Sequence, residues 1–230
     1  FTIISVTGFV SLCMTFQMYG DRTLINVSFM ITAQIIYMIA LWNLNKSFKA
    51  NYNANVKITS LSQTDHLTKL LNRREFEKQF NALFKLSQRP ALSISVFMID
   101  IDYFKDYNDG YGHQQGDNAI KLQSDILKHV FKRDSDLLGR YGGEEFIVAV
   151  SNITLEQTRR LAQSILDNWS EEKLPHAKGR GQEFVSCSVG FEYCLGNEYT
   201  NTEDIINLAD QALYAAKNSG RACYKQARQN

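Results

Sequence analysis

Two long runs without a single charged side chain dominate the N-terminal part of this sequence. They fill residues 1–45 except for the neighbours Asp21 and Arg22. Each run has about the 20 residues that a helix needs to cross a bilayer, and both are richer in Ile, Phe, Met, Tyr and Leu than a signal peptide with its short apolar core. The sequence therefore predicts two transmembrane helices, joined by a very short loop at Gly20-Asp21-Arg22.

The residues that follow favour a membrane orientation over a soluble alternative. Scattered Gln and Asn side chains dilute the hydrophobicity, so a pair of buried helices in a soluble domain is the competing interpretation. Lys46, Lys49 and Lys57 come next, with no acidic residue before Asp65, and this excess of positive charge is typical of the cytoplasmic side of a membrane. We therefore expect everything after the second span to lie in the cytoplasm. Because the chain starts with Phe1 instead of Met, we expect the spans to be the end of a longer membrane region.

Residues 46–64 are polar, contain no Pro or Gly, and have only sparse apolar positions. We expect them to form a connector helix, which could pair with itself in a dimer. The apolar spacing is too irregular for a heptad repeat.

The composition excludes several classes of function. The net charge of the whole chain is +1, which gives no electrostatic case for binding nucleic acid. Four scattered cysteines, with no Cys-x-x-Cys spacing, argue against a zinc site and against a disulfide framework. A reducing, cytosol-facing environment fits this pattern best.

From residue 65 onward, the apolar periodicity predicts helix, strand, helix, strand hairpin, helix, strand, helix, strand. This order predicts an α/β (α+β) domain over residues 65–230, with an antiparallel hairpin at the centre of its sheet. The clearest strand is Ala91–Asp100, whose continuous apolar end indicates a central position. Residues 100–117 are polar and contain three glycines, which are expected to break any helix. Gly190 is a candidate β-bulge, and His176 is expected to be exposed to solvent.

The segment Arg140-Tyr141-Gly142-Gly143-Glu144-Glu145-Phe146 lies between two predicted strands. Adjacent glycines there indicate a tight hairpin turn in which both glycines can take positive φ without cost. A turn without side chains lets phosphates approach closely, and Glu144 and Glu145 place negative charge where a cation or a reacting hydroxyl would sit. An ordinary solvent-exposed turn with charged neighbours is the alternative interpretation.

Asp100 ends the predicted central strand, where a carboxylate is costly unless it is paired or bound to a metal. If neighbouring strands bring Asp100 close to Glu144, the two carboxylates suit Mg²⁺, which prefers a few carboxylates together with substrate phosphates. Asn108 and Asp117 could read a purine edge, because a carboxylate accepts well from the two N–H donors of guanine. Three cations are candidate phosphate ligands, although two of them also complement a helix dipole: Lys105, Lys217 and Arg221.

At these positions the chain resembles a known family, the GGDEF domains or diguanylate cyclases, in the Gly-Gly-Glu-Glu-Phe form of their signature at residues 142–146. The resemblance covers about residues 61–228, and the only visible departure is Glu144 in place of Asp, which keeps the carboxylate. Four further motifs occur in the same order: Asp65-x-Leu67-Thr68-x-Leu70-x-Asn72-Arg73-Arg74, Asp100-Ile101-Asp102-x-Phe104-Lys105-x-x-Asn108-Asp109, Gly112-His113-x-x-Gly116-Asp117, and Ala212-Leu213-Tyr214-x-Ala216-Lys217-x-x-Gly220-Arg221.

The resemblance implies an adenylyl-cyclase-like palm fold with a central, mostly antiparallel sheet flanked by helices. It implies a homodimer that condenses two GTP into cyclic di-GMP and two pyrophosphates. It also implies two Mg²⁺ ions per active site, with Mn²⁺ as a substitute, held by Asp100, the carbonyl of Ile101, and Glu144. Either Glu144 or Glu145 would help deprotonate the attacking 3′-hydroxyl, and we favour Glu144. The substrate-binding residues would be Asn108, Asp117 and His113 at guanine, Lys105, Lys217 and Arg221 at the phosphates, and Gly142 and Gly143 beneath the nucleotide.

The resemblance also places Arg133 and Asp136 at the family's product-binding inhibitory site, so inhibition by cyclic di-GMP is expected. An Arg–Asp pair that closes a helix is the alternative interpretation of these two residues. Together with the predicted spans, the resemblance implies a bacterial-type cytoplasmic (inner) membrane protein whose catalytic domain is in the cytoplasm. A catalytically silent sensor of GTP or cyclic di-GMP is the alternative function, although such domains usually lose signature carboxylates or glycines, and here all are present.

Overall fold

The computed structural model describes residues 20–88, 92–176 and 183–228. The chain divides into two compact units, one ending at Leu61 and the other beginning at Ser62. Each unit is described by itself, beginning with the N-terminal one.

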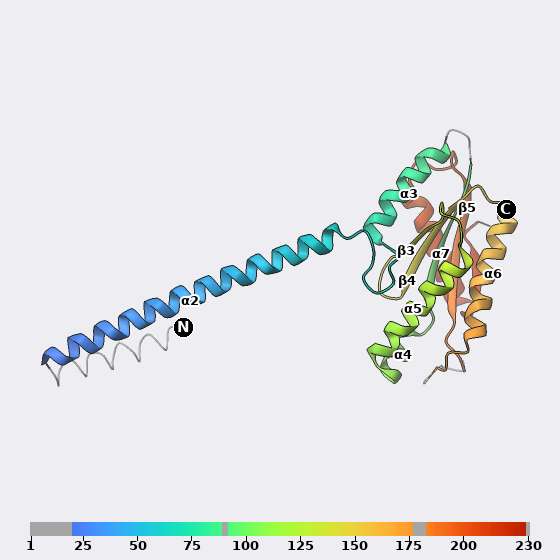
Figure 1. Ribbon diagram of the computed structural model, residues 1–230. Helices are drawn as coiled ribbons and strands as arrows, with labels where there is room; N and C mark the ends of the chain where they lie inside the picture. Colours follow the sequence, from blue (N-terminus) through green and yellow to red (C-terminus); the bar gives the residue numbers. More distant parts are fainter. Residues whose placement is uncertain (1–19, 89–91, 177–182, 229–230) are drawn as a thin grey trace. The chain divides into compact units, whose positions relative to one another are not determined.

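Helix α2, Gly20–Leu61, is a single helix of 42 residues (Figure 1). It contains the second predicted span and nearly all of the predicted connector without a break, as expected for a stretch that has no Pro or Gly after its first residue. The predicted loop at Gly20-Asp21-Arg22 is wrong, because α2 begins at Gly20 and both charged residues lie in its first turn.

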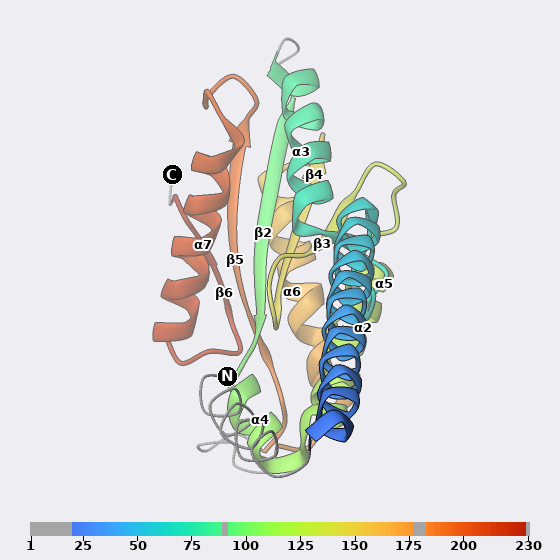
Figure 2. The same cartoon turned by 90° about the vertical axis from the view of Figure 1, so that its left-hand side faces the viewer.

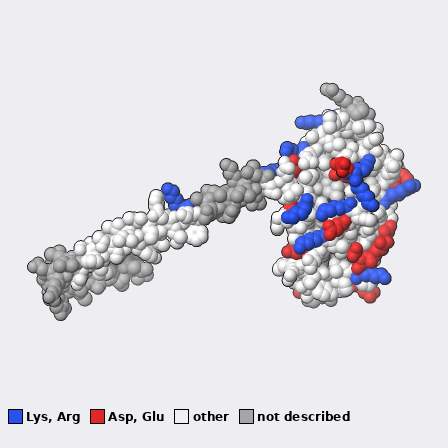
Figure 3. All heavy atoms as spheres, viewed as in Figure 1, with Lys and Arg blue, Asp and Glu red and all other residues white. Residues whose placement is uncertain are grey.

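One helical stretch among the described residues is long and apolar enough to cross a membrane, Asn26–Lys49. Two spans were predicted, and the first of them falls on residues 1–19, outside the described part of the chain. Most apolar side chains of Asn26–Lys49 are exposed, with Phe29 at 72% and Trp42 at 63%, and Figure 3 shows few charges along this part of α2. Lys46 lies over the Trp42 ring, with Nζ 5.2 Å from its centroid.

The second unit is built around one sheet with the strand order β1-β3-β4-β2-β5-β6 (Figure 2). The three inner pairings are antiparallel, whereas both outer pairings, β1 with β3 and β5 with β6, are parallel. The sheet is therefore mixed, and β4 and β2 are its two central strands, with β3 to one side. The strands are β1 Leu71–Asn72, β2 Ser93–Ile101, β3 Leu137–Arg140, β4 Glu145–Ser151, β5 Cys187–Leu195 and β6 Tyr224–Gln226.

Helices cover both faces of this sheet (Figures 1 and 2). Successive side chains of β2 point to opposite faces of the sheet, and each face has its own hydrophobic core. Phe97 and Ile99 lie in one core, and Val96 and Met98 lie in the other. The first core is closed by α5 and α6, and the second by α3 and α7. The helices are α3 Arg73–Gln88, α4 Phe104–Tyr111, α5 His113–Val130, α6 Leu155–Glu172 and α7 Thr202–Asn218.

Two expectations about glycines are wrong. The polar stretch 100–117 contains α4 and the start of α5, although glycines were expected to break any helix there. Only Gly112, at φ +83°, separates the two helices, while Gly116 lies inside α5, where an added Cβ would collide with the Asn108 side chain. Gly190 marks no bulge, because β5 pairs with β2 without interruption. A Cβ there would collide with the backbone of α7, so this glycine lets the helix pack directly on the strand.

Candidate active site

The C-terminal end of β2 and the turn between β3 and β4 lie side by side at the same end of the strands. The Cα of Asp100 on β2 pairs with Glu145 on β4 and with Ser188 on β5. Asp100 is only 5% exposed, and Nζ of Lys217, in the last turn of α7, lies 2.8 Å from its Oδ2. This ion pair offsets part of the cost of burying the Asp100 carboxylate.

Negative charge accumulates at this point. Burial first, and the nearby Glu144 and Glu145 carboxylates second, raise the pKa of Asp100 to about 6 against the opposing effect of Lys217. A carboxylate whose pKa is raised in this way lacks enough positive charge around it. A divalent cation would supply that charge.

A cavity of about 260 Å³ opens beside Asp100. Lys105 enters it from the first turn of α4, and Arg221 from the turn that follows α7. The cavity thus joins carboxylates on the sheet to cations on two helical elements. Six of the sequence-predicted residues line it: Asp100, Ile101, Lys105, Glu144, Lys217 and Arg221.

The donor set suits a metal that shares its coordination with a substrate. Among the described residues, no group of three His, Cys, Asp or Glu side chains is arranged to hold an ion by itself. Asp100 and Glu144 line one cavity, and the backbone of Ile101 borders it. Two carboxylates and a carbonyl leave positions for phosphate oxygens and water, which is the coordination that Mg²⁺ prefers.

Residues 141–144 connect β3 to β4, so the turn is longer than the predicted tight hairpin. Neither Gly142 nor Gly143 has positive φ, which corrects the expected turn geometry. The space above Gly143 is open, because an added Cβ there would meet nothing within 4 Å. The turn is thus open to a ligand because there is free space above Gly143, and not because its glycines have a special backbone conformation.

Arg140 holds this turn in place. Its Nε and Nη2 donate to the carbonyl of Gly143 at 3.0 and 2.8 Å, and its Nη1 lies 3.2 Å from each carboxylate oxygen of Asp65. Burial alone would raise the pKa of Asp65, but the Thr68 amide and hydroxyl and the Arg140 charge together lower it. Both Arg140 and Asp65 lie in motifs of the sequence, but the sequence analysis assigned a role to neither. The two residues are 75 positions apart, so no local pattern indicated that they form an ion pair.

The predicted guanine-binding residues lie outside the cavity. Asn108 is on α4 and packs against Gly116 of α5, and its buried Oδ1 accepts no hydrogen bond from the described residues. His113 and Asp117 are exposed in the first turns of α5. An unsatisfied buried acceptor near exposed polar side chains can receive a donor from a ligand.

His176 is buried at 9% exposure, so the expectation that it is solvated is wrong. Its ring packs edge-on against Tyr103 and Tyr107, with centroids 6.3 and 5.9 Å away.

Tyr103 and Asp102 also lie beside the site, and sequence reasoning assigned a role to neither of them.

Arg133 and Asp136 lie apart from this cavity, between α5 and β3. Arg133 Nε is 3.1 Å from Asp136 Oδ1, so the Arg–Asp pair of the alternative interpretation is present. The two residues also line a cavity of about 390 Å³, together with Gln157 and Arg160 of α6. Its cations suit an anionic ligand.

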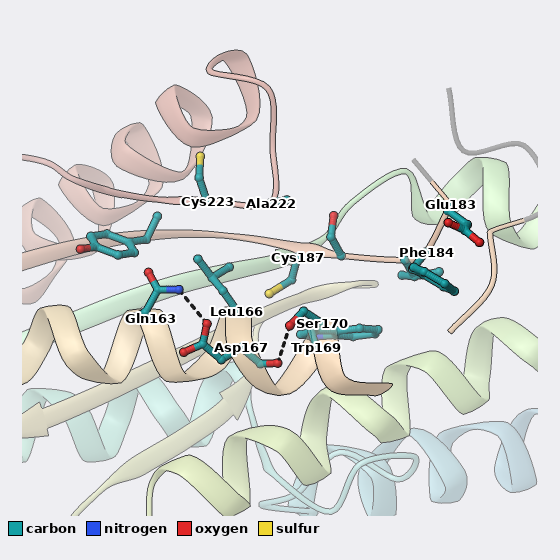
Figure 4. Close-up of a pocket in the computed structure, with 13 residues that line it drawn as sticks. Gln163, Leu166, Asp167, Trp169, Ser170, Glu183, Phe184, Cys187, Ala222 and Cys223 are labelled. Carbon is teal, nitrogen blue, oxygen red and sulfur yellow. Dashed lines mark hydrogen bonds between the residues drawn. The ribbon is translucent and has the colours of Figure 1, made fainter. Parts of the chain in front are cut away.

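A larger cavity, about 570 Å³, lies between α6 and the strands β5 and β6 (Figure 4). Trp169, Phe184 and Leu166 give it apolar walls, and Ala222 and Cys223 close one side. None of the sequence-predicted site residues lines it.

Residues 62–223 match the family described as "Diguanylate cyclase, GGDEF domain". The chain is 32% identical over 199 residues to an uncharacterized membrane protein of Staphylococcus saprophyticus. The aligned region covers 86% of this chain and 53% of that protein. The chain is 29% identical over 221 residues to an uncharacterized membrane protein of Staphylococcus aureus (strain USA300), with coverages of 96% and 60%. The chain thus spans little more than half the length of these curated relatives.

Solved structures share the fold. The GGDEF domain of DgcB from Caulobacter crescentus in complex with c-di-GMP superposes with a TM-score of 0.66 at 28% identity, over 73% of this chain and 94% of that one. The active GGEEF domain of a diguanylate cyclase from Vibrio cholerae gives a TM-score of 0.62 at 33% identity, over 70% and 99%. The predicted α/β palm fold is therefore confirmed, with a mixed sheet.

Proposed function

Because this chain belongs to the GGDEF domain family, we propose that it is a diguanylate cyclase, which condenses two GTP into cyclic di-GMP and two pyrophosphates. One observation supports this proposal most directly. The carboxylates of Asp100 and Glu144 and the cations of Lys217 and Arg221 line one cavity beside an open glycine turn. A charged triphosphate and its counterion need both signs of charge within a small volume.

In this proposal Asp100, the carbonyl of Ile101 and Glu144 would hold Mg²⁺, two ions per site, which when bound would supply positive charge to the phosphates and a lower pKa to the attacking hydroxyl. Lys105, Lys217 and Arg221 bind phosphate oxygens. All three residues line the cavity.

The guanine base would lie against α4 and α5. The exposed Asp117 carboxylate can accept from the paired N–H donors that guanine has and adenine lacks. The Oδ1 of Asn108 is buried against Gly116, so Asn108 would accept from guanine after its side chain turns toward the base. His113, at the start of α5, borders the same surface. Specificity for guanine follows because a site built to accept two hydrogen bonds leaves its acceptors unpaired with other bases.

The chemistry needs two chains. Each domain offers one GTP site, so two domains must face one another for each 3′-hydroxyl to attack the α-phosphate of the other nucleotide. Gly142 and Gly143 form the floor beneath the nucleotide, with open space above Gly143. Glu144 is the proposed base, because its carboxylate lines the cavity, and Glu145 is the second candidate.

The N-terminal part anchors the catalytic domain in the proposed organisation. Residues 1–45 contain the membrane helices, residues 46–64 the connector, and residues 65–230 the catalytic domain. The exposed apolar stretch Asn26–Lys49 and relatives described as membrane proteins support a cytoplasmic membrane location. An anchor confines the domains to two dimensions and raises the rate at which they meet.

Arg133 and Asp136 are the proposed inhibitory site for cyclic di-GMP. The cavity of about 390 Å³ beside them carries the further cation Arg160, which sequence reasoning missed. Guanidinium groups bind phosphate bidentately and stack on guanine. Arg133→Ala is expected to raise the inhibition constant for cyclic di-GMP while leaving initial turnover intact. An unchanged inhibition constant would remove this site from the proposal.

The deciding experiment incubates the full chain in detergent micelles with GTP and Mg²⁺ and measures cyclic di-GMP by chromatography. We expect product, loss of product with EDTA, and none from Glu144→Gln. Glu171→Gln, which removes an exposed carboxylate from α6, is the matched control and retains turnover. GTP binding without any cyclic dinucleotide from a dimeric preparation would favour the alternative, a catalytically silent sensor.

A further inference from the structure

The turn that carries Arg221 has an unusual backbone. Gly220, Arg221 and Ala222 follow α7 with φ of +107°, +66° and +47°. Residues with a side chain rarely adopt positive φ, and two in succession need contacts that hold them there. Arg221 lines the catalytic cavity, so these contacts also determine where its side chain begins.

Asp102 provides the contact from below the turn. Its carboxylate is 1% exposed and accepts from the amide of Ala222 at 3.1 Å. It also accepts from the hydroxyls of Ser186 and Ser188, each at 2.7 Å, which ties it to the start of β5. Asp102 therefore fastens the left-handed turn to the central strands.

Tyr103 provides the contact from the side of the cavity. The guanidinium carbon of Arg221 lies over the Tyr103 ring, 4.3 Å from its centroid, and Nη1 of Arg221 donates to the Tyr103 hydroxyl at 3.2 Å. Tyr103 itself has φ +53° as the residue that precedes α4, a conformation that an aromatic residue seldom adopts. Tyr103 and Arg221 thus both have a left-handed backbone conformation, and in this conformation the Tyr103 ring and the Arg221 guanidinium contact each other.

We propose that Tyr103 is a positioning residue that orients Arg221 for the nucleotide triphosphate, on a turn that Asp102 fixes. This inference rests on the proposed function, in which Arg221 binds a phosphate of GTP. A free arginine loses considerable rotamer entropy when it is fixed on a phosphate. Stacking on Tyr103 fixes the guanidinium before the ligand arrives, so less entropy is lost on binding. Lys217 needs no such support, because Asp100 already holds it.

The test is a double-mutant cycle on nucleotide affinity. Binding of a non-hydrolysable GTP analogue with Mg²⁺ is measured calorimetrically for the full chain in micelles. The wild type is compared with the Tyr103→Leu and Tyr103→Phe variants. We expect Tyr103→Leu to weaken binding about tenfold, the size of a partly desolvated cation–π contact. Tyr103→Phe, which keeps the ring, should restore most of the loss. Asp102→Asn, which weakens the hold on the Ala222 amide, should also weaken binding.

The same substitution is then repeated in two backgrounds. In Arg221→Ala, Tyr103→Leu should have no further effect, because the group it positions is gone. In Lys217→Ala it should still weaken binding about tenfold, because Lys217 is held by a different residue. This pair of backgrounds separates an effect transmitted through Arg221 from a general disturbance of the site.

Two results would overturn the inference by itself: a wild-type affinity in Tyr103→Leu, or an equal loss in the Arg221→Ala background. Either could occur while the wild-type chain still makes cyclic di-GMP, so the proposed function would stand. A wild-type chain that neither binds the analogue nor forms product would overturn both proposals together.

Discussion

The Asp100–Lys217 ion pair shows how the site stays stable before any ligand binds. Lys217 Nζ lies 2.8 Å from Oδ2 of Asp100, the carboxylate that is proposed to hold the metal. In the proposed site, lysine and metal would therefore compete for this carboxylate. The phosphates of a bound nucleotide would give Lys217 a new partner and leave Asp100 free to bind the metal.

This competition predicts opposite effects of one substitution on two ligands. Lys217→Met should tighten Mn²⁺ binding about fivefold without nucleotide, since the ion pair that the ion must displace, with side chains 30% and 8% exposed, contributes about 1 kcal/mol. The same substitution should weaken binding of the GTP analogue. Both are measurable by titration at pH 8. Arg221→Met is the matched control, because its contacts lie with Tyr103 and not with Asp100, and it should weaken only the nucleotide. Weaker metal binding in Lys217→Met would contradict this account.

The Asp65–Arg140 pair predicts a pH dependence of stability. The pKa of Asp65 in the folded chain lies below its ordinary value of 3.8, so its contribution is fully present above that value and is lost as pH falls through the lower, folded pKa. Asp65→Asn should therefore cost about 1 kcal/mol at pH 7, and the difference from wild type should shrink below pH 4. Urea unfolding followed by circular dichroism at several pH values measures this. A difference that is constant with pH would show that the charge of Asp65 is irrelevant.

Helix α7 packs directly on β5 at Gly190. A Cβ at Gly190 would collide with the backbone of Ala209 and Leu213, neither of which can move without shifting the whole helix. Lys217 and Arg221 are carried by the end of this helix, so its distance from the sheet also sets how far the cations reach.

Gly190→Ala should therefore destabilise the fold by about 3 kcal/mol, at the upper end of overpacking effects. Thermal or urea unfolding measures the loss. Gly143→Ala is the control for stability, because an added Cβ there would meet nothing within 4 Å and φ is not positive. Equal midpoints for Gly190→Ala and wild type would mean that the helix can move away from the strand at little cost.

Local patterns were sufficient for the elements that bury a continuous apolar face. The strand predicted at Ala91–Asp100 is β2, Ser93–Ile101, and the last predicted helix is α7, which buries an apolar face that begins at Ile205. The predicted fold class follows from the order of such elements.

Tertiary contacts decided the rest. Gly116 is a poor helix former by propensity, yet it lies inside α5 because only a glycine fits against Asn108. His176 is polar and follows a proline, yet aromatic rings from the α4 region bury it. In the site, the motifs named the residues that line the cavity, whereas the partners that hold them, Tyr103 and Arg140, depend on long-range geometry that no local pattern records.

For the molecule as a whole, the important point is that each chain supplies half of the proposed reaction. The unit that begins at Ser62 is compact by itself and carries one cavity with the predicted catalytic residues. In the proposed reaction, two such units would have to meet around two nucleotides before a bond could form.

Turnover by residues 62–230 should therefore rise with the square of protein concentration at low concentration. Fusing this unit to a parallel two-stranded coiled coil should make the rate proportional to concentration and raise it at nanomolar protein. Initial rates across a hundredfold range of concentration measure the order. A strictly linear dependence in the unfused unit, with no dimer by light scattering, would show that one chain suffices.

The unbroken course of α2 has a consequence for how such a chain can be regulated. A helix of 42 residues is roughly 63 Å long, at about 1.5 Å per residue, and every residue turns it by about 100°. Without a Pro or an interior Gly to absorb torsion, the angular phase at its last turn is set by the phase within the apolar stretch. The length of this helix is thus not a free spacer. Adding one residue would rotate the rest of the helix beyond it by more than a quarter turn, whereas adding seven would nearly restore the original phase.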